Sequence, residues 1–279
     1  MSPRAKRVLF NDVKKSRNAP LQEITNTFNQ GRPRRVSQRT IRRVLREEGY
    51  QRRVIRKAIR LRVPNRRNRL AWRRGKLYLP VTGYWDRVIF SDESKVEIGA
   101  NKRVYIWRKA REQWKPECMN TPPRKKFGVM VWGCISYNGV GTLAFVEGTL
   151  NAQGYQDILE KHLWPIVAKY FPSEDFIFQD DNAPVHRARC TVEYKLRNKI
   201  KSLSWPAQSP DINIIENIWL RLKNALQRNI DAITSVDELK TAVTTAWMNV
   251  PNNYIHWLYN SIPRRLRAVV VSKGNITKY

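Results

Sequence analysis

The apolar residues of the first fifty positions predict three short helices. In each segment they recur three or four residues apart, which places them on one face of a helix. The segments are residues 5–17 with Val8, Leu9 and Val13, residues 20–28 with Leu21, Ile24 and Phe28, and residues 37–48 with Ile41, Val44 and Leu45. Pro20 suits the first helical position, Ser37 suits a cap and Gly49 suits a stop. A small helical unit whose last helix is rich in arginine is typical of a helix-turn-helix.

The pattern changes near residue 85, where short apolar runs of strand length alternate with longer stretches of helical period. The predicted strands cover residues 86–94, 103–108, 127–136, 141–150, 176–180 and 201–206, and the predicted helices cover residues 65–78, 151–171, 186–199 and a long stretch from about 214. This succession favours an α/β domain, with a mixed sheet flanked by helices. We therefore expect a helical domain over 1–55, a basic linker with one helix over 56–84, and an α/β domain over 85–279.

The charge of the chain indicates a polyanionic partner. Its 279 residues carry 53 Lys and Arg against 23 Asp and Glu, a formal net charge of +30. Residues 1–80 hold 25 of the basic side chains and only four acids, so most of the excess lies in the first quarter. This basic footprint predicts binding to nucleic acid. We interpret residues 52–76 as a DNA-tracking linker that also serves import into the nucleus; the alternative is a purely solvating linker.

Several other classes of protein are disfavoured. Cys118, Cys134 and Cys190 are too widely spaced for a disulfide framework or a zinc site, which fits a reducing compartment. No apolar run approaches the ~18 residues that a membrane span needs. A GxxxxGK[ST] phosphate loop is absent from the sequence. We therefore expect neither a membrane partner nor a nucleotide cofactor.

The arginines of the third predicted helix are candidates for contact with DNA. Arg39, Arg42, Arg43 and Arg46 would face phosphates or guanine edges if this helix enters the major groove. The alternative is a solvated helix face. In the loop before this helix, Arg32, Arg34 and Arg35 belong to a Gly-Arg-Pro-Arg stretch that can lie extended in a narrow minor groove, although a basic loop with Gly and Pro is commonplace.

Four acids stand out at the ends of predicted elements. Asp92 ends the first strand of the α/β domain, Asp180 and Asp181 follow a later strand, and Glu216 lies in the first turn of the long helix. Desolvated carboxylates need a cation, and an all-oxygen ligand set suits Mg²⁺ or Mn²⁺. The alternative for Glu216 is a capping box with Asn213.

Four stretches of the sequence resemble the catalytic blocks of the Tc/mariner superfamily of DDE transposases, in its Sleeping Beauty-like branch. They are "VIFSDES", "VMVWGCIS", "FQDDNAPVH" and "WPAQSPDINIIENIW", and 34 residues separate the acids of the last two. The family ligand directly precedes the Asn of the "DN" pair, so the resemblance selects Asp181 over Asp180. Adjacent strand residues point to opposite faces, which makes Glu93 a bystander beside Asp92. His186 is interpreted as structural rather than as a contact to phosphate or to Asp180.

The resemblance implies a fold, an activity and partners. We expect an RNase H-like catalytic domain that holds two Mg²⁺, with Mn²⁺ as a substitute, on Asp92, Asp181 and Glu216. The expected activity is double-strand cleavage at terminal inverted repeats and insertion at TA sites, by a homodimer on DNA in the nucleus. The family has two helix-turn-helix units and only one fits before residue 60, so the first is expected to be missing.

Two other classes of function remain open from the sequence alone. One is a domesticated or truncated DNA-binding protein with the transposase fold and little transposition activity, against which the three intact acids argue. The other is an RNA-processing nuclease of the same fold. A helix-turn-helix favours duplex DNA over RNA, whose deep major groove excludes a helix.

Overall fold

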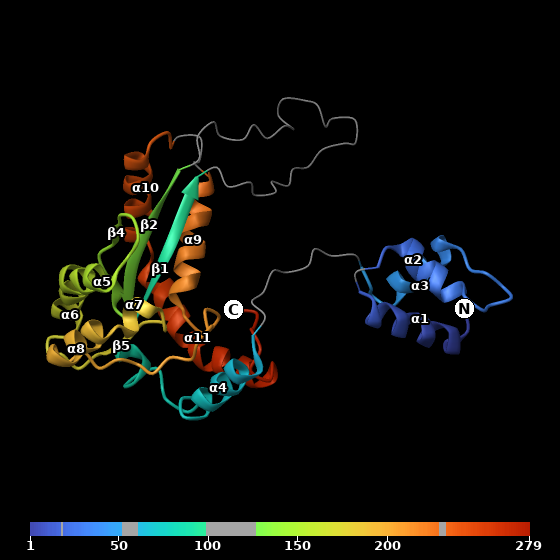
Figure 1. The fold of residues 1–279 in the computed structure, drawn as a ribbon, viewed down its shortest axis with the longest axis horizontal. Coiled ribbons are helices and arrows are strands. Elements are labelled where there is room, and N and C mark those ends of the chain that lie inside the picture. The colour runs from blue at the N-terminus through green and yellow to red at the C-terminus, as the bar shows by residue number, and fades with distance from the viewer. Residues whose placement is uncertain (18, 52–60, 99–126, 229–232) are drawn as a thin grey trace. The chain divides into compact units, whose positions relative to one another are not determined.

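The chain forms two compact units, which we describe separately. The structure is a computed structural model and describes residues 1–17, 19–51, 61–98, 127–228 and 233–279. The units are Met1–Ala58 and Ile59–Tyr279 (Figure 1). The predicted strand over 103–108 and the first residues of the predicted linker, up to residue 60, lie outside the described residues.

The first unit contains the three predicted helices. They are α1 (Pro3–Lys15), α2 (Leu21–Asn29) and α3 (Gln38–Glu47). Their buried apolar residues form one cluster, composed of Leu9, Val13, Phe28, Ile41, Val44 and Leu45. The Ser37 hydroxyl accepts the N–H of Thr40 and caps α3, as predicted, whereas Pro20 lies one position before the first residue of α2. The small core explains why so basic a segment folds, since its arginines lie outside the cluster.

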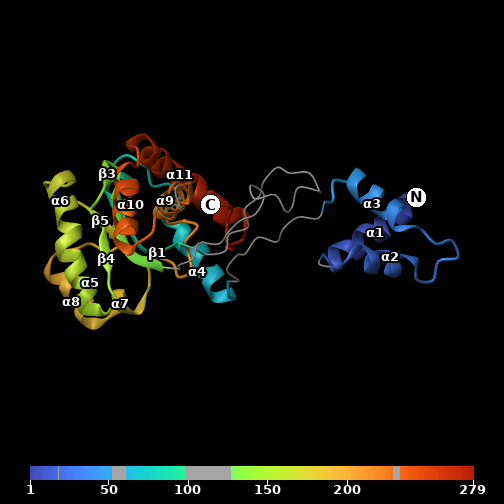
Figure 2. The ribbon, with the colours of Figure 1, turned by 90° about the horizontal axis from the view of Figure 1, so that it is seen from above.

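Among its described residues, the second unit contains a five-stranded mixed sheet with helices on both faces (Figure 2). The strands are β1 (Val88–Ile98), β2 (Phe127–Ser136), β3 (Gly139–Val140), β4 (Ala144–Val146) and β5 (Ile177–Gln179). The order is β3-β2-β1-β5, and β4 also pairs with β2. β1 runs antiparallel to β2 and parallel to β5, so the predicted mixed sheet is confirmed.

The helices of this unit divide into two groups that cover opposite faces of the sheet. Their bounds are α4 (Val63–Arg74), η1 (Trp85–Arg87), α5 (Ala152–Ile158), the π-helical turn η4 (Leu159–Leu163), α6 (Trp164–Tyr170), α7 (Pro184–Arg187), α8 (Arg189–Arg197), α9 (Ile215–Arg228), α10 (Val236–Met248) and α11 (Asn252–Val271). The cores of α9, α10 and α11 share one apolar cluster, and α5, η4 and α6 share the other. No helix in the described ranges is long and apolar enough to cross a membrane.

Three of the expected strands differ from the structure, and the one expected over 141–150 forms only the short β4 (Ala144–Val146). β1 continues to Ile98, so Asp92 lies inside the strand, opposite Gly133 of β2, and does not end it. Residues 201–206 form only an isolated bridge between Ser202 and Phe178, because β5 is three residues long and offers little edge to pair with. The predicted helix over 186–199 is divided in two at Ala188, whose backbone is extended.

Gly133 lets two helices approach the sheet beside Asp92. A Cβ atom at this position would lie 2.9 Å from the Trp247 ring and 3.0 Å from the Trp219 ring. These two rings stack with their centroids 4.8 Å apart, between α9 and α10. The glycine therefore allows α9, which carries Glu216, to pack directly over β1 and β2.

Helix α4 packs on the second unit through one fully buried arginine. Arg69 donates to both carboxylate oxygens of Asp211 at 2.8 and 2.7 Å, to the Ser209 hydroxyl at 2.7 Å, and to the carbonyls of Gly274 and Asn275 at 2.9 and 3.2 Å. We call this group of five residues the Arg69 clasp. The sequence predicts a basic linker with one helix over 56–84; the structure contains that helix, α4, and groups it with the α/β unit.

Candidate active site

The three predicted ligands lie where the sheet opens beside β1. β5 pairs with β1 only as far as Gln179 opposite Phe90, and beyond that point no described strand pairs with this edge of β1. Asp92 follows two residues later, and Asp181 follows the end of β5 by two residues. Strand alternation places Asp92 on the same face of β1 as Phe90. Phe90 belongs to the apolar cluster that includes α9, and Glu216 lies in the first turn of α9.

The electrostatics of Asp92 indicate that the acids share one environment. Its pKa lies well above the ordinary value, first because of burial and then because of repulsion by Glu216, Glu93 and Asp181. The pKa of Glu216 is also raised, because loss of water around its carboxyl group disfavours the charged form more than the attraction of Lys223 favours it. Added positive charge would stabilise the ionised form of a cluster of this kind.

The capping-box alternative for Glu216 is not realised. The Asn213 side chain accepts the N–H of Ile215 at 3.4 Å and so caps the first turn of α9. In a capping box, Glu216 would in return accept the backbone N–H of Asn213. That N–H instead donates to the Ser209 carbonyl at 3.4 Å. Glu216 is therefore left available for another role.

His186 orients Asp181, which the sequence did not predict. Its Nδ1 contacts Asp181 Oδ1 at 2.8 Å and its Nε2 contacts Glu93 Oε1 at 3.2 Å, and its ring lies against the Tyr155 ring at an angle of 35°. Burial opposes a charge on His186, but these two carboxylates outweigh it and raise its pKa to about 9. The bond from His186 in turn lowers the pKa of Asp181. The acid that His186 contacts is thus Asp181 and not Asp180. Glu93, which the sequence predicted to be a bystander, contacts the other nitrogen of the same ring.

Asp180 serves the fold rather than the site. It is buried, forms an ion pair with the buried Lys195, and accepts the Tyr155 hydroxyl at 3.1 Å. Asp181, its neighbour, has a side chain 52% exposed. The two acids therefore point to different environments, as strand alternation predicts. The cation that neutralises Asp180 is Lys195, nine residues beyond the "DDNAPVH" stretch. The sequence offered no signal that these two residues would pair.

The donor set fits a hard divalent cation in its chemistry. Asp92, Asp181 and Glu216 supply carboxylate oxygens only, and the raised pKa of Asp92 marks a site where added positive charge would be stabilising. Within the described ranges, no three His, Cys, Asp or Glu side chains converge closely enough to hold a metal ion as they stand. Binding would therefore require the carboxylates to turn toward a common centre.

The first unit presents an arginine-rich face on α3. Arg39, Arg42, Arg43 and Arg46 are all exposed, and Arg43 forms a loose ion pair with Glu47 at 3.7 Å. The other side of α3 is buried through Ile41, Val44 and Leu45. The four side chains are thus available together on one face, as a helix that reads a groove requires.

The loop before α3 is closed at its base. The Asn29 side chain donates to the Val36 carbonyl and accepts the Val36 N–H, both at 2.9 Å. Arg34 and Arg35 are exposed, whereas the Arg32 guanidinium lies 3.9 Å from the centre of the Phe28 ring. Arg32 would have to leave this ring to enter a minor groove.

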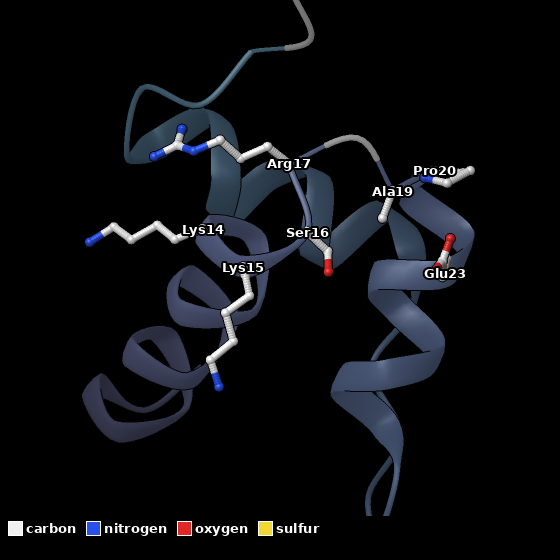
Figure 3. Close-up of a pocket in the computed structure, with 7 residues that line it drawn as sticks. All are labelled: Lys14, Lys15, Ser16, Arg17, Ala19, Pro20 and Glu23. Carbon is white, nitrogen blue, oxygen red and sulfur yellow. The ribbon is translucent and has the colours of Figure 1, made fainter. Parts of the chain in front are cut away.

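A second basic surface lies where α1 meets α2. Figure 3 shows Lys14, Lys15 and Arg17 extending from the end of α1, with Glu23 on the facing helix. The three cations are exposed. They come from α1 and the turn after it, not from α3, and so offer a matched contrast for tests of the α3 face.

Both parts of the chain match families of known proteins. A family described as "DDE superfamily endonuclease" matches residues 87–240, and a helix-turn-helix family described as "Transposase" matches residues 6–76. The chain is 34% identical to the Tcb1 transposase of Caenorhabditis briggsae over 247 residues, which cover 87% of this chain and 88% of the relative. It is also 34% identical to the Tc3 transposase of Caenorhabditis elegans over 199 residues, 70% of this chain and 59% of the relative.

Solved structures share the fold at low sequence identity. A paired-end complex of Mos1 transposase with the left transposon end superposes with a TM-score of 0.82, at 19% identity, and covers 100% of this chain and 82% of that one. Mos1 paired-end complexes with Mg and with Mn give TM-scores of 0.81 and 0.77, also at 19% identity, covering 100% and 98% of this chain and 82% and 80% of theirs. This likeness confirms the expected architecture, a helical region followed by an RNase H-like domain.

Proposed function

The chain belongs to the Tc1/mariner family of cut-and-paste DDE transposases, and from this premise we propose that it cleaves both strands at the terminal inverted repeats of its element and joins the ends to TA sites. The observation that carries the proposal is the shared environment of Asp92, Asp181 and Glu216 at the open edge of β1. The family match over residues 87–240 includes all three acids.

We propose that Asp92, Asp181 and Glu216 hold two Mg²⁺ ions, for which Mn²⁺ can substitute. Such ions stabilise the attacking and leaving oxygens when a phosphodiester is displaced in line. The chain's own contribution is to hold the ligands. His186 fixes one oxygen of Asp181, and the buried Asp180–Lys195 pair anchors the turn that follows β5.

DNA recognition is assigned to the first unit. Arg39, Arg42, Arg43 and Arg46 would read or follow a major groove, while Arg32, Arg34 and Arg35 would reach the adjacent minor groove. The exposed arginine face of α3 supports this assignment. The basic sequence of residues 52–76 supports action in the nucleus, as part of the same proposal.

The test is cleavage of a DNA that carries the element's own terminal repeats. The whole protein is incubated with this DNA with and without Mg²⁺, and a DNA with scrambled repeats serves as the control. We expect strand cleavage at the repeat ends that needs the metal. Repeat-specific binding without cleavage under any divalent metal would instead support a DNA-binding protein that has lost the reaction.

Residues 1–58 alone should bind duplex DNA with an affinity that falls steeply as salt rises. This unit carries 17 Lys and Arg against four acids. If ~6 phosphates are neutralised, the slope of log affinity against log salt should be near −5. Fluorescence anisotropy across a salt series measures it.

Single substitutions in this unit can separate sequence recognition of DNA from non-specific electrostatic binding. Arg42→Gln or Arg43→Gln should reduce the preference for terminal repeats over random DNA by about tenfold. The matched change Lys14→Gln, on the other basic surface, should leave that preference unchanged. A salt-independent affinity, or an equal effect at Lys14, would refute the assignment to α3.

We further propose that the active species is a homodimer on DNA, because two element ends must be brought together. Light scattering of the protein bound to terminal-repeat DNA should give the mass of two chains and two DNA ends. A complex with one chain that still excises a marked element would contradict this.

A further inference from the structure

Three segments of the second unit carry the proposed ligands. One buried residue, Ser91, lies in the segment of Asp92 and forms hydrogen bonds to the segments of Asp181 and Glu216. Ser91 is 2% exposed and directly precedes Asp92. Its hydroxyl donates to the Gln179 carbonyl at 2.8 Å, two residues before Asp181. Its own carbonyl accepts from Asn213 Nδ2 at 3.3 Å, three residues before Glu216. Ser91 thus connects β1 to the segment that bears each of the other acids.

The position of Ser91 explains why these bonds are needed. The ladder between β1 and β5 ends at Phe90 and Gln179, so Ser91 is the first residue beyond it. Its hydroxyl extends the contact between the strands by one residue. In the part of the chain that the structure describes, no further strand pairs at this edge, and a side chain from the segment before α9 supplies the donor for the Ser91 carbonyl.

Asn213 has both ends of its amide committed. Its Nδ2 donates to Ser91, and its Oδ1 accepts the N–H of Ile215 at the start of α9. The side chain is 4% exposed, so neither bond competes freely with water. The amide of asparagine donates from its nitrogen and accepts at its oxygen, so one short side chain can make both bonds. An ionised carboxylate could only accept, and a hydroxyl would have to make both bonds through one atom.

We propose that Ser91 and Asn213 are positioning residues for the reaction, which hold Asp92, Asp181 and Glu216 in the relative placement that the metal ions require. The inference rests on the proposed function, because positioning has meaning only if these acids bind the ions. Neither residue touches the substrate or the ions. Their effect passes through the backbone that carries each ligand.

The test compares four variants of the whole protein. Ser91→Ala removes the hydroxyl, and Ser91→Thr keeps it. Asn213→Ser keeps a capping oxygen for α9 but is too short to reach Ser91. Ser136→Ala is the matched control, since Ser136 is fully buried and its hydroxyl donates to the Gly139 carbonyl at 3.3 Å in a hairpin that carries none of the three acids.

Three quantities are measured for each variant. They are Mn²⁺ affinity by calorimetry, the Mg²⁺ concentration that gives half-maximal cleavage, and hydrogen exchange in residues 88–94 and 211–217. Ser91→Ala and Asn213→Ser should weaken Mn²⁺ binding and raise the Mg²⁺ requirement by about 10- to 100-fold, the usual effect of losing a group that orients a ligand. Exchange should rise in both segments, even when only one of the two residues is changed. Ser91→Thr should restore the wild-type values.

The outcomes that overturn the proposal are distinct. Faster exchange in both segments with unchanged Mn²⁺ affinity would show that the two residues only stabilise the fold. Effects no larger than those of Ser136→Ala would show that the bonds are dispensable. If the wild-type protein itself neither binds Mn²⁺ nor cleaves DNA, the proposed function fails and the positioning role fails with it.

Discussion

Asp92→Asn, Asp181→Asn and Glu216→Gln should each reduce strand cleavage by roughly a thousandfold or more, since each removes a charge that holds the ions which stabilise the transition state. Binding to terminal-repeat DNA should remain close to that of the wild type, because the α3 arginines belong to the other unit. Gel analysis of nicked products and a parallel binding assay measure the two effects. Wild-type cleavage by any one variant in Mg²⁺ would remove that residue from the ligand set.

The folding stability of these variants should differ in a way that the electrostatics predict. The pKa of Asp92 is raised, so its charged form is disfavoured in the fold, and Asn should not destabilise the protein. The pKa of Asp181 is lowered, first by the bond from His186, so Asn should weaken that contact and cost some stability. Glu97→Gln is the control. It removes an acid from the same strand, in an exposed pair with Lys95, and should change neither cleavage nor binding.

Arg69→Met should destabilise the second unit by about 3–5 kcal/mol. It leaves the Asp211 carboxylate buried without its charged partner, which is the costly way to break a buried ion pair. Asp211→Asn should cost a similar amount, because Arg69 is fully buried as well. Urea unfolding followed by tryptophan fluorescence gives the free energy of unfolding of each variant.

The control for this prediction is an ion pair of the same length at the surface. Arg189 and Glu193 also approach to 2.7 Å, but Arg189 has a side chain 92% exposed. Arg189→Met should therefore change stability by less than about 1 kcal/mol. If Arg69→Met costs no more than Arg189→Met, the Arg69 clasp does not hold α4 to the sheet.

Periodicity was enough to predict the three helices of the first unit and the start of α9, whose apolar residues recur on one face, but it did not divide α7 from α8 or identify α10 and α11 as separate helices. Ser37 and Gly49 bracket α3 through local backbone chemistry that the sequence displays directly. Strand ends were harder to predict. Whether β1 stops at Asp92 or continues to Ile98 depends on β2, which pairs with it from Phe90 to Ile98, and no local pattern reports that partner.

The acids of the candidate site were recognisable because each occurs in a short block of sequence. Their supporting residues were not, because support comes from segments far apart in the chain. Lys195 neutralises Asp180, Ser91 connects with Gln179 and Asn213, and Arg69 meets Asp211 142 residues later. A buried polar side chain gives no sequence signal of its partner, since pairing is decided by how the elements pack.

The Arg69 clasp also decides where chimaeras of this protein can be joined. One place to exchange the DNA-binding unit between relatives is the boundary that the sequence predicts for the catalytic domain, near residue 85. A junction there would import a foreign α4 and with it a foreign partner for Asp211. Thr277 N–H donates to the same carboxylate at 2.9 Å, so the last residues of the chain would be released as well. The natural crossover point lies before α4, and a hybrid joined there keeps helix, acid and carboxyl-terminal tail from a single parent.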